Sequence, residues 1–213
     1  MTVARESALA SRPVYEFSKR VLDVSLALVA LILASPILIL AAMAVRCSSR
    51  GSILFRQTRV GRYGRPFTCL KFRTMVMDAE RVLADDPELT AKFVNAYKLR
   101  RDWRVTRVGC ILRKLSLDEL PQLWNIVRGE MSLVGPRPVP ADELHTKYGP
   151  VASQVVSVRP GLTGLWQVSG RGATSYQERV QLDVSYVERR SLLLDMWIIA
   201  RTPVALLTMR GAH

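Results

Sequence analysis

The longest hydrophobic segment of the chain covers residues 24–45 and carries no charged side chain. Because about 20 apolar residues are enough to cross the hydrocarbon core of a bilayer, its length permits a transmembrane helix. Ser35 and Pro36 lie at its middle, where proline removes a backbone donor and biases the preceding residue away from helical angles. On hydropathy alone the pattern favours a single span kinked at Pro36, because membrane helices tolerate such kinks.

The alternative for this segment is a re-entrant hairpin that enters and leaves the same leaflet. A helix broken at Pro36 has arms of about 11 and 9 residues, so each arm reaches only about half of the ~30 Å core. Basic residues also flank both ends, so the excess of Lys and Arg expected in cytoplasmic loops favours export of neither end. These residues are Lys19 and Arg20 before the segment, and Arg46, Arg50, Arg56 and Arg59 after it.

The rest of the chain is predicted to combine one β-hairpin with several helices. The turn-rich residues 61–66 separate two segments with strand-like composition, which predicts strands at 52–57 and 67–73. Apolar spacing and capping signals predict helices over residues 78–99, over 141–148, and from a capping box at Ser175 and Glu178. The apolar residues 192–209 are interrupted by charges and a proline, and are expected to lie at the membrane interface or to pack on the core.

The second predicted strand places two cations on one face. Strand alternation directs Leu70 and Phe72 to one side and Lys71 and Arg73 to the other. A solvated edge strand is one interpretation, since lysine commonly protects exposed edges. An anion pocket lined by the two cations is the other.

The composition points to an anionic partner. Of the 213 residues, 31 are Lys or Arg and 18 are Asp or Glu, which gives a net charge of +13. Such an excess is typical of proteins that contact nucleic acid, acidic membranes or phosphorylated ligands. The hydrophobic fraction of 49% favours the membrane, and we expect no nucleic acid among the partners.

Cysteine and histidine usage excludes several kinds of site. Cys47, Cys69 and Cys110 are scattered and form no C-x-x-C pair, which favours a reducing compartment without a disulfide framework. Only His145 and His213 are present, so a zinc site or a Ser-His-Asp triad is not expected. The glycines form no Walker or dinucleotide-binding fingerprint.

Residues 115–124 hold the strongest candidate for chemistry. Asp118 and Glu119 are adjacent acids within a frame of leucines and a tryptophan, and arginines and a lysine precede them. A carboxylate pair in such surroundings suits a phosphorylated substrate with a metal ion. A structural interpretation is equally open, because Ser116 and Glu119 match a capping box and Asp118 is an alternative helix cap before Pro121.

Three arginines recur in loops rich in glycine or proline. Arg137 lies within Gly-Pro-Arg-Pro, Arg159 precedes Pro-Gly, and Arg171 lies between two glycines. Prolines fix backbone angles and glycines allow close approach, so such loops can hold an arginine as an anion clamp. Each alone is more typical of a turn with a solvated arginine, but three of them beside a carboxylate pair favour the clamp.

Four motifs occur in register and together resemble the bacterial monotopic phosphoglycosyl transferases, which begin glycan assembly on polyprenyl phosphate. The resemblance extends from about residue 17 to the C-terminus. Any single motif is weak evidence, whereas four in the same order and spacing are specific. The motifs are KFRTM at 71–75, SLDELPQL at 116–123, SLVGPRP at 132–138 and VRPGLTGLWQV at 158–168.

The resemblance implies a mostly helical α+β fold. Its expected parts are a flexible tail at 1–16, a re-entrant membrane anchor at 17–50 broken at Ser35-Pro36, and a catalytic domain at 51–213. The catalytic domain is expected to contain the small β-hairpin and interfacial amphipathic helices. The family therefore reverses the choice that hydropathy alone favours for residues 24–45. It also implies a minimal catalytic unit without the further N-terminal membrane domain of larger relatives.

The reaction implied by the resemblance moves a hexose-1-phosphate from a UDP-hexose to a polyprenyl phosphate such as undecaprenyl phosphate, and releases UMP. Asp118 is the expected covalent nucleophile, and Glu119 positions it or binds Mg²⁺ with it. Three more residues, Lys71, Arg113 and Arg137, are expected to hold phosphate oxygens, with Arg171 as a weaker candidate. Residues 99–106 resemble the hexose-transferring branch, which favours galactose or glucose.

The expected location is the cytoplasmic face of the bacterial inner membrane, in contact with its lipids; a homodimer is left open. Two rival functions are considered. A membrane-tethered nucleic-acid-binding protein would bind generic DNA in a salt-sensitive way and release no UMP. A UDP-sugar phosphodiesterase would use the acid pair to break down UDP-sugars without a lipid acceptor.

Overall fold

A computed structural model describes residues 12–77, 104–170 and 174–208 of the chain. Its elements are mainly helices, with two small two-stranded sheets, in agreement with the expected mostly helical α+β fold. The chain divides into two compact units, each described by itself. Unit 1 comprises Met1–Ala34, Arg56–Leu70 and Pro121–Ala212, and unit 2 comprises Ser35–Phe55, Lys71–Leu120 and His213.

The N-terminal helix α2 (Pro13–Ser48) runs through the predicted break without interruption, with Pro36 inside it. The structure thus describes one helix through Pro36, as hydropathy alone favoured, and the break that the resemblance implied is not present in it. A proline removes one backbone hydrogen bond, and the good helix formers around it keep the remaining ones. The boundary between the two units nevertheless falls at this point, between Ala34 and Ser35.

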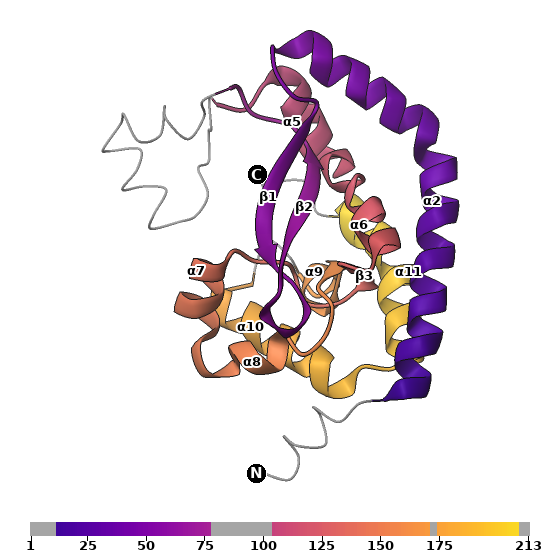
Figure 1. Cartoon of the computed structure of the whole chain (residues 1–213), viewed down its shortest axis with the longest axis vertical. Helices are drawn as coiled ribbons and strands as arrows, with labels where there is room; N and C mark the ends of the chain where they lie inside the picture. Colours follow the sequence, from indigo (N-terminus) through magenta and orange to yellow (C-terminus); the bar gives the residue numbers. More distant parts are fainter. Residues whose placement is uncertain (1–11, 78–103, 171–173, 209–213) are drawn as a thin grey trace. The chain divides into compact units, whose positions relative to one another are not determined.

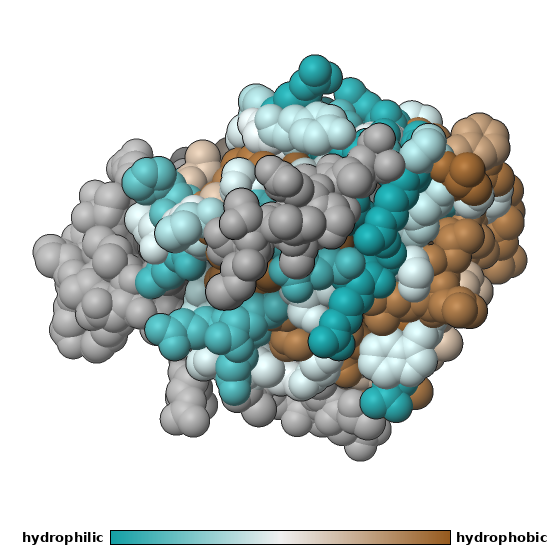
Figure 2. All heavy atoms as spheres, turned by 90° about the horizontal axis from the view of Figure 1, so that it is seen from below, coloured by the Kyte–Doolittle hydropathy of each residue, from teal (hydrophilic) through white to brown (hydrophobic). Residues whose placement is uncertain are grey.

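Helix α2 is long and apolar enough to cross a membrane, and only 11% of its most apolar window is buried within the protein. Its exposed large apolar side chains include Phe17, Ile32, Leu33 and Leu40. Figure 2 shows a group of hydrophobic residues at the surface of the protein. This agrees with membrane association, and the re-entrant path remains a prediction.

The predicted β-hairpin is confirmed, with its first strand displaced. Strand β1 (Leu54–Val60) begins two residues later than expected and continues to the turn, and it pairs with β2 (Pro66–Phe72) (Figure 1). The turn contains a short 3-10 segment, η1 (Arg62–Gly64). Within it Tyr63 adopts a φ of 59°, a left-handed conformation that is uncommon for a tyrosine.

The core of unit 2 forms between three segments that are distant in the sequence. Ala41 and Val45 from α2, Phe72 from β2, and Leu112 from α5 (Arg107–Lys114) are all buried in one cluster. Partly buried residues extend this cluster, including Leu117 of the 3-10 turn η2 (Leu117–Glu119). The same core thus supports the end of β2 and the turn that carries the acid pair.

The core of unit 1 is built around a parallel pair of short strands that the sequence pattern did not predict. Strand β3 (Ser132–Val134) pairs with β4 (Gly161–Thr163). Two helices, α10 (Tyr176–Arg189) and α11 (Leu192–Thr208), contribute Tyr186, Val187 and Ile198 to the cluster around Val134. Glycine is required at Gly161, because a Cβ atom there would lie 2.1 Å from the backbone nitrogen of Gly135.

The other predicted helices differ in detail. The predicted helix 141–148 is α7 (Ala141–Glu143) continued by a π-type segment, η3 (Leu144–Tyr148). The capping box of α10 is confirmed, with the Ser175 N–H donating to Glu178 at 2.7 Å. The predicted helix 78–99 lies outside the described residues. The remaining elements are α6 (Gln122–Arg128), η4 (Gly149–Val151), α8 (Ala152–Val155) and α9 (Leu165–Val168).

Candidate functional site

The acid pair lies on the 3-10 turn η2, and it does not form a capping box. Ser116 precedes the turn in a left-handed conformation with φ 54°, and its side chain makes no capping hydrogen bond. The next helix, α6, has Pro121 at its N-cap, and no side chain caps it either. The structure therefore contradicts both capping interpretations of Ser116, Asp118 and Glu119.

Glu119 instead pairs with a cation from the end of the hairpin. The Nζ atom of Lys71 donates to Oε1 of Glu119 at 2.8 Å. Only 19% of the lysine side chain and 15% of the glutamate side chain are exposed, so the pair is partly withdrawn from water. A partly buried ion pair holds its two groups more firmly than a surface pair does, because solvent screens it less.

Asp118 is partly buried beside this ion pair. Burial raises the pKa of the Asp118 carboxyl above its ordinary value, and the neighbouring charge of Glu119 raises it further. The cations of Lys71 and Arg113 act in the opposite direction and favour the ionised carboxylate. A carboxylate that is partly removed from water and lies near two cations is typical of a reactive group rather than of a surface acid.

Arg113 is oriented by Thr74, which follows β2. The Nε atom of Arg113 donates to Oγ1 of Thr74 at 2.9 Å, and the Thr74 carbonyl accepts from the N–H of Thr106, the N-cap of α5. Gly109 in the first turn of α5 has no room for a side chain, since a Cβ would lie 2.1 Å from the Thr74 oxygen. Within the described residues the two terminal nitrogens of Arg113 have no partner, and they remain able to bind an anion.

Arg73 does not join this group. Its Nη2 atom donates to the carbonyl and the hydroxyl of Ser49, just beyond the C-terminus of α2, at 2.7 and 2.9 Å. A cation at the C-terminus of a helix is favoured by the helix dipole. The expected face with two cations therefore serves two purposes: Lys71 contacts the acid pair, and Arg73 secures the end of α2.

Arg137 belongs to unit 1, in the loop that follows β3. Its guanidinium carbon lies 5.8 Å from the centre of the Trp166 ring. Arg179 contacts the same ring at 4.8 Å and the Tyr176 ring at 5.0 Å. Burial lowers the pKa of the nearby Arg59, and the charge of Arg137 is the next largest cause. Unit 1 thus places two arginines, Arg137 and Arg179, against Trp166, and the carboxylate of Glu143 lies 3.4 Å from Arg179.

The sequence analysis missed Arg179 and Asp183, because both lie on the helix that it treated as an ordinary amphipathic one. Asp183 is almost completely buried at 1% exposure and accepts a hydrogen bond from the Tyr148 hydroxyl at 2.8 Å. Burial raises its pKa to about 6, although Tyr148, Arg179 and Arg137 oppose the shift. Their positions on the apolar side of α10 were the only available signal.

Four of the predicted site residues thus come together in unit 2, namely Lys71, Arg113, Asp118 and Glu119. Arg137 is described in unit 1, and Arg171 lies outside the described residues. In the part of the chain that the structure describes, no three His, Cys, Asp or Glu side chains gather as a ready-made metal cage. The adjacent carboxylates of Asp118 and Glu119 are hard oxygen donors of the kind that Mg²⁺ uses together with substrate phosphates.

Comparison with known proteins identifies the family. The family model described as bacterial sugar transferase matches residues 14–209. The chain is 49% identical over 208 residues to the exopolysaccharide production protein ExoY of Sinorhizobium fredii, which covers 96% of this chain and 92% of that protein.

Two further relatives carry names that describe a reaction. The UDP-glucose:undecaprenyl-phosphate glucose-1-phosphate transferase of Caulobacter vibrioides is 44% identical over 95% of this chain and 74% of its own length. The undecaprenyl-phosphate galactose phosphotransferase of Salmonella typhimurium is 43% identical over 92% of this chain and 42% of its own length. The chain therefore belongs to the bacterial sugar transferase family and is a phosphoglycosyl transferase.

Proposed function

We propose that this protein transfers a hexose-1-phosphate from a UDP-hexose to a polyprenyl phosphate, releases UMP, and uses Asp118 as a covalent nucleophile. The observation that carries the proposal is the partly buried Asp118 carboxylate beside the Lys71–Glu119 ion pair and Arg113. The names of the relatives from Caulobacter and Salmonella both support a hexose and an undecaprenyl phosphate acceptor, and the Caulobacter name also supports a UDP-hexose donor.

In the first half-reaction, an oxygen of the Asp118 carboxylate attacks the phosphorus atom next to the sugar. The bond between this phosphorus and the bridging oxygen of the diphosphate breaks, and UMP leaves with the bond electrons. The product on the enzyme is an acyl phosphate that carries the sugar. Aspartate suits this role because its short side chain is positioned closely by the backbone, and an acyl phosphate is reactive enough to pass the group on.

In the second half-reaction, an oxygen of the polyprenyl phosphate attacks the same phosphorus atom. The bond to Asp118 breaks, which regenerates the free carboxylate and yields a polyprenyl diphosphate sugar. Both substrates carry negative charge at the reacting centre, so cations must approach it. The charges of Lys71 and Arg113 act on the Asp118 carboxyl. Arg137 is a further candidate cation, from the family motif.

The two acids have different tasks in this scheme. Asp118 must be ionised to attack, and Lys71 and Arg113 counteract the burial that favours its protonated form. Glu119 holds Lys71 at 2.8 Å and thereby fixes that cation beside the nucleophile. Asp118 and Glu119 would also hold Mg²⁺, which when bound supplies positive charge for the diphosphate.

A lipid-borne acceptor and a soluble donor require a site at a membrane surface. The exposed apolar side chains of α2 fit an element embedded in lipid, and we propose that the active site faces the cytoplasm, where UDP-sugars are made. The product then serves as the first membrane intermediate of an exopolysaccharide.

The test is UMP release by the purified protein from UDP-galactose, UDP-glucose and UDP-N-acetylglucosamine, with and without undecaprenyl phosphate. We expect release from the hexose donors and a phosphosugar adduct on Asp118 that mass spectrometry can map. Asp118→Asn should lose the adduct, while Asp142→Asn at an exposed site should retain it.

Other outcomes would contradict specific parts of the proposal. Sustained breakdown of UDP-sugar without the lipid acceptor would establish a phosphodiesterase. Turnover by Asp118→Asn, or an obligatory ternary complex without an adduct, would exclude the covalent mechanism. Activity with N-acetylated sugars alone would contradict the hexose assignment and leave the reaction class intact.

A further inference from the structure

Unit 1 contains a small pocket whose residues are not among those of the proposed reaction. It is enclosed by the N-terminal part of α2, the hairpin turn, and the residues around β3 and β4. Its lining is strongly basic: the side chains of Lys19, Arg20, Arg62, Arg159 and Arg190 face two carboxylates, those of Glu16 and Asp23. An excess of positive charge in a concave site favours an anionic ligand.

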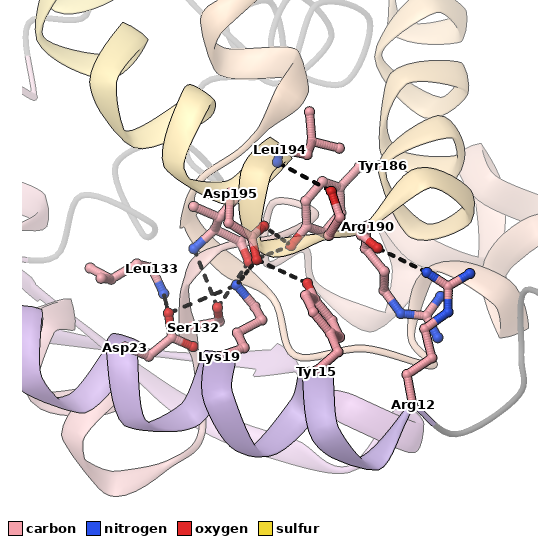
Figure 3. A network of polar contacts seen from close by, with 12 residues as sticks. Arg12, Tyr15, Lys19, Asp23, Ser132, Leu133, Tyr186, Arg190, Leu194 and Asp195 are labelled. Atoms are coloured by element: carbon pink, nitrogen blue, oxygen red, sulfur yellow. Dashed lines mark hydrogen bonds and ion pairs between the residues drawn. The ribbon is translucent and has the colours of Figure 1, made fainter.

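Several polar side chains that line this pocket belong to one network of hydrogen bonds and ion pairs (Figure 3). Asp195 is completely buried and accepts hydrogen bonds from Tyr15 at 2.9 Å, Lys19 at 3.0 Å and Tyr186 at 2.7 Å. Asp23 accepts from the backbone N–H of Leu133 at 3.1 Å. This network fixes the wall of the pocket, and Lys19 is neutralised within it.

Arg20 is likewise engaged. Its two terminal nitrogens donate to the carbonyl oxygens of Ile126 and Val127, in the last turn of α6, at 2.6 and 2.9 Å. The carbonyl oxygen of Ile126 also accepts from the N–H of Gly129, and the helix dipole favours a cation at this end of α6. Arg20 therefore contributes charge to the pocket, and both of its terminal nitrogens are held by α6.

Arg62 and Arg159 differ from Arg20, because each keeps at least one terminal nitrogen that no group among the described residues uses. Arg62 donates through Nε to Ser157 at 3.0 Å and through Nη2 to Glu16 at 2.7 Å, which leaves Nη1. Arg159 donates through Nε to Gly129 at 2.9 Å. Among the described residues neither terminal nitrogen of Arg159 has a hydrogen-bond or ion-pair partner.

The two arginines are also crowded by like charge. Burial lowers the pKa of Arg159, and the charges of Arg62 and Arg20 lower it further, although Glu16 and Asp23 oppose the shift. Glu16 is the one carboxylate that pairs with Arg62 among the described ion pairs. An additional anion would offset this repulsion and accept the unused N–H groups.

We propose that Arg62 and Arg159 form a binding site for a phosphate group, with no residue in common with the Asp118 site. Phosphate matches the fork of a guanidinium group and accepts several charge-assisted hydrogen bonds at once. The group belongs either to a soluble phosphate compound or to the headgroup of an anionic lipid. A lipid is a credible source because exposed apolar residues, such as Val14 and Phe17, lie on the same part of α2.

The test is equilibrium binding of radiolabelled inorganic phosphate to the full-length protein in nanodiscs of phosphatidylcholine. We expect Arg62→Gln and Arg159→Gln each to weaken binding by about tenfold or more, since each removes charged donors. Arg65→Gln is the matched control, because it removes the same charge from an exposed position in the same turn. Unchanged binding in both test variants, or an equal loss in the control, would overturn the proposal.

A second variant separates ligand binding from folding. Arg159→Lys keeps the positive charge but cannot hold Gly129 and also present a fork, so it should bind phosphate with intermediate affinity. Affinity equal to that of Arg159→Gln in a folded Arg159→Lys protein would count against a phosphate contact at this residue. The readout does not require turnover, so its outcome is independent of the proposed transferase reaction.

The lipid arm replaces half of the phosphatidylcholine with phosphatidylglycerol. A lower apparent phosphate affinity in these nanodiscs, which disappears in Arg159→Gln, would identify a lipid headgroup as the occupant. Unchanged affinity in phosphatidylglycerol would identify a soluble phosphate compound. Both results support the site, and they decide only the source of its phosphate.

Discussion

The Nζ atom of Lys71 lies 2.8 Å from Oε1 of Glu119, and this contact ties the end of strand β2 to the 3-10 turn that carries Asp118. The two residues are separated by 47 intervening positions, many of them outside the described residues. The pair gives Glu119 a partner that a capping box would not provide. It also places a cation where it influences the charge of Asp118.

Glu119→Gln should lower turnover by roughly a hundredfold, because glutamine keeps the shape but no longer neutralises and holds Lys71. The measurement is the initial rate of UMP release at saturating donor and acceptor. The control is Glu178→Gln, since Glu178 does occupy a capping box and glutamine can cap as well. If both substitutions change the rate of UMP release only slightly, the role of Glu119 is purely structural.

Asp118→Asn should abolish turnover and should stabilise the fold at neutral pH. Because burial and Glu119 raise the pKa of Asp118 in the folded state, the folded protein binds the proton more tightly than the unfolded chain. The wild type therefore loses stability as the pH rises from the unfolded value of about 3.9 through the folded pKa. Thermal melts at several pH values should show an advantage of the variant that grows over this range, whereas a constant difference would argue against the raised pKa.

Thr74→Val should lower kcat by about tenfold, because it removes the hydroxyl that orients Arg113 and leaves the guanidinium group less well placed. Thr74→Ser retains the hydroxyl and should remain close to the wild type. The backbone contacts of Thr74 to Thr106 are unaffected in both variants, so both should fold. Equal activities of the two variants would show that the Arg113–Thr74 contact has no catalytic importance.

Arg137→Lys should not restore the activity lost in Arg137→Gln, if this arginine binds phosphate through two parallel hydrogen bonds. A lysine supplies the charge without the planar fork. The comparison uses kcat/KM for the UDP-sugar, with Arg128→Gln as a control at an exposed ion pair. Near-normal rates for both Arg137 variants would remove this residue from the substrate site.

Residues 24–45 should enter and leave the same leaflet, so that both flanks are cytoplasmic. The test places single cysteines at Ser11 and Arg65 and labels intact cells with a membrane-impermeant reagent, after replacing the native Cys47, Cys69 and Cys110. Cys47 and Cys110 are exposed and would otherwise contribute their own signal. Both positions should be shielded from the periplasm, and Pro36→Leu should shift the segment toward spanning. Periplasmic labelling at position 11 in the wild type would establish a single span.

Local patterns in the sequence determined the elements whose causes are local. The turn residues between β1 and β2 predicted the hairpin, and the Ser175–Glu178 spacing predicted the start of α10. The uncharged residues 24–45 predicted an apolar helix, and hydropathy alone favoured its continuity through Pro36, whereas the family resemblance implied a break there. Each of these depends on neighbours within a few positions, which a single sequence displays directly.

Features that join distant segments required the tertiary structure. The parallel pairing of β3 with β4 depends on the close approach of Gly135 and Gly161. Strands of three residues are too short for a recognisable alternation of apolar and polar residues, so the sequence did not predict this pairing. Arg73 looked equivalent to Lys71 by strand alternation, yet it binds Ser49 at the end of α2. Periodicity gives the face of a strand but not the groups that fold against that face.

Asp118 and Glu119 illustrate the difference between what the sequence determined and what required the tertiary structure. The sequence by itself determined that Asp118 and Glu119 are adjacent acids in an apolar frame within a family motif, but it left capping and chemistry equally open. Only the tertiary structure excluded capping, by placing Ser116 in a left-handed conformation and Lys71 against Glu119. The physical reason is that a carboxylate takes its role from the charges and donors around it, and here the closest of these comes from a strand far away in the sequence.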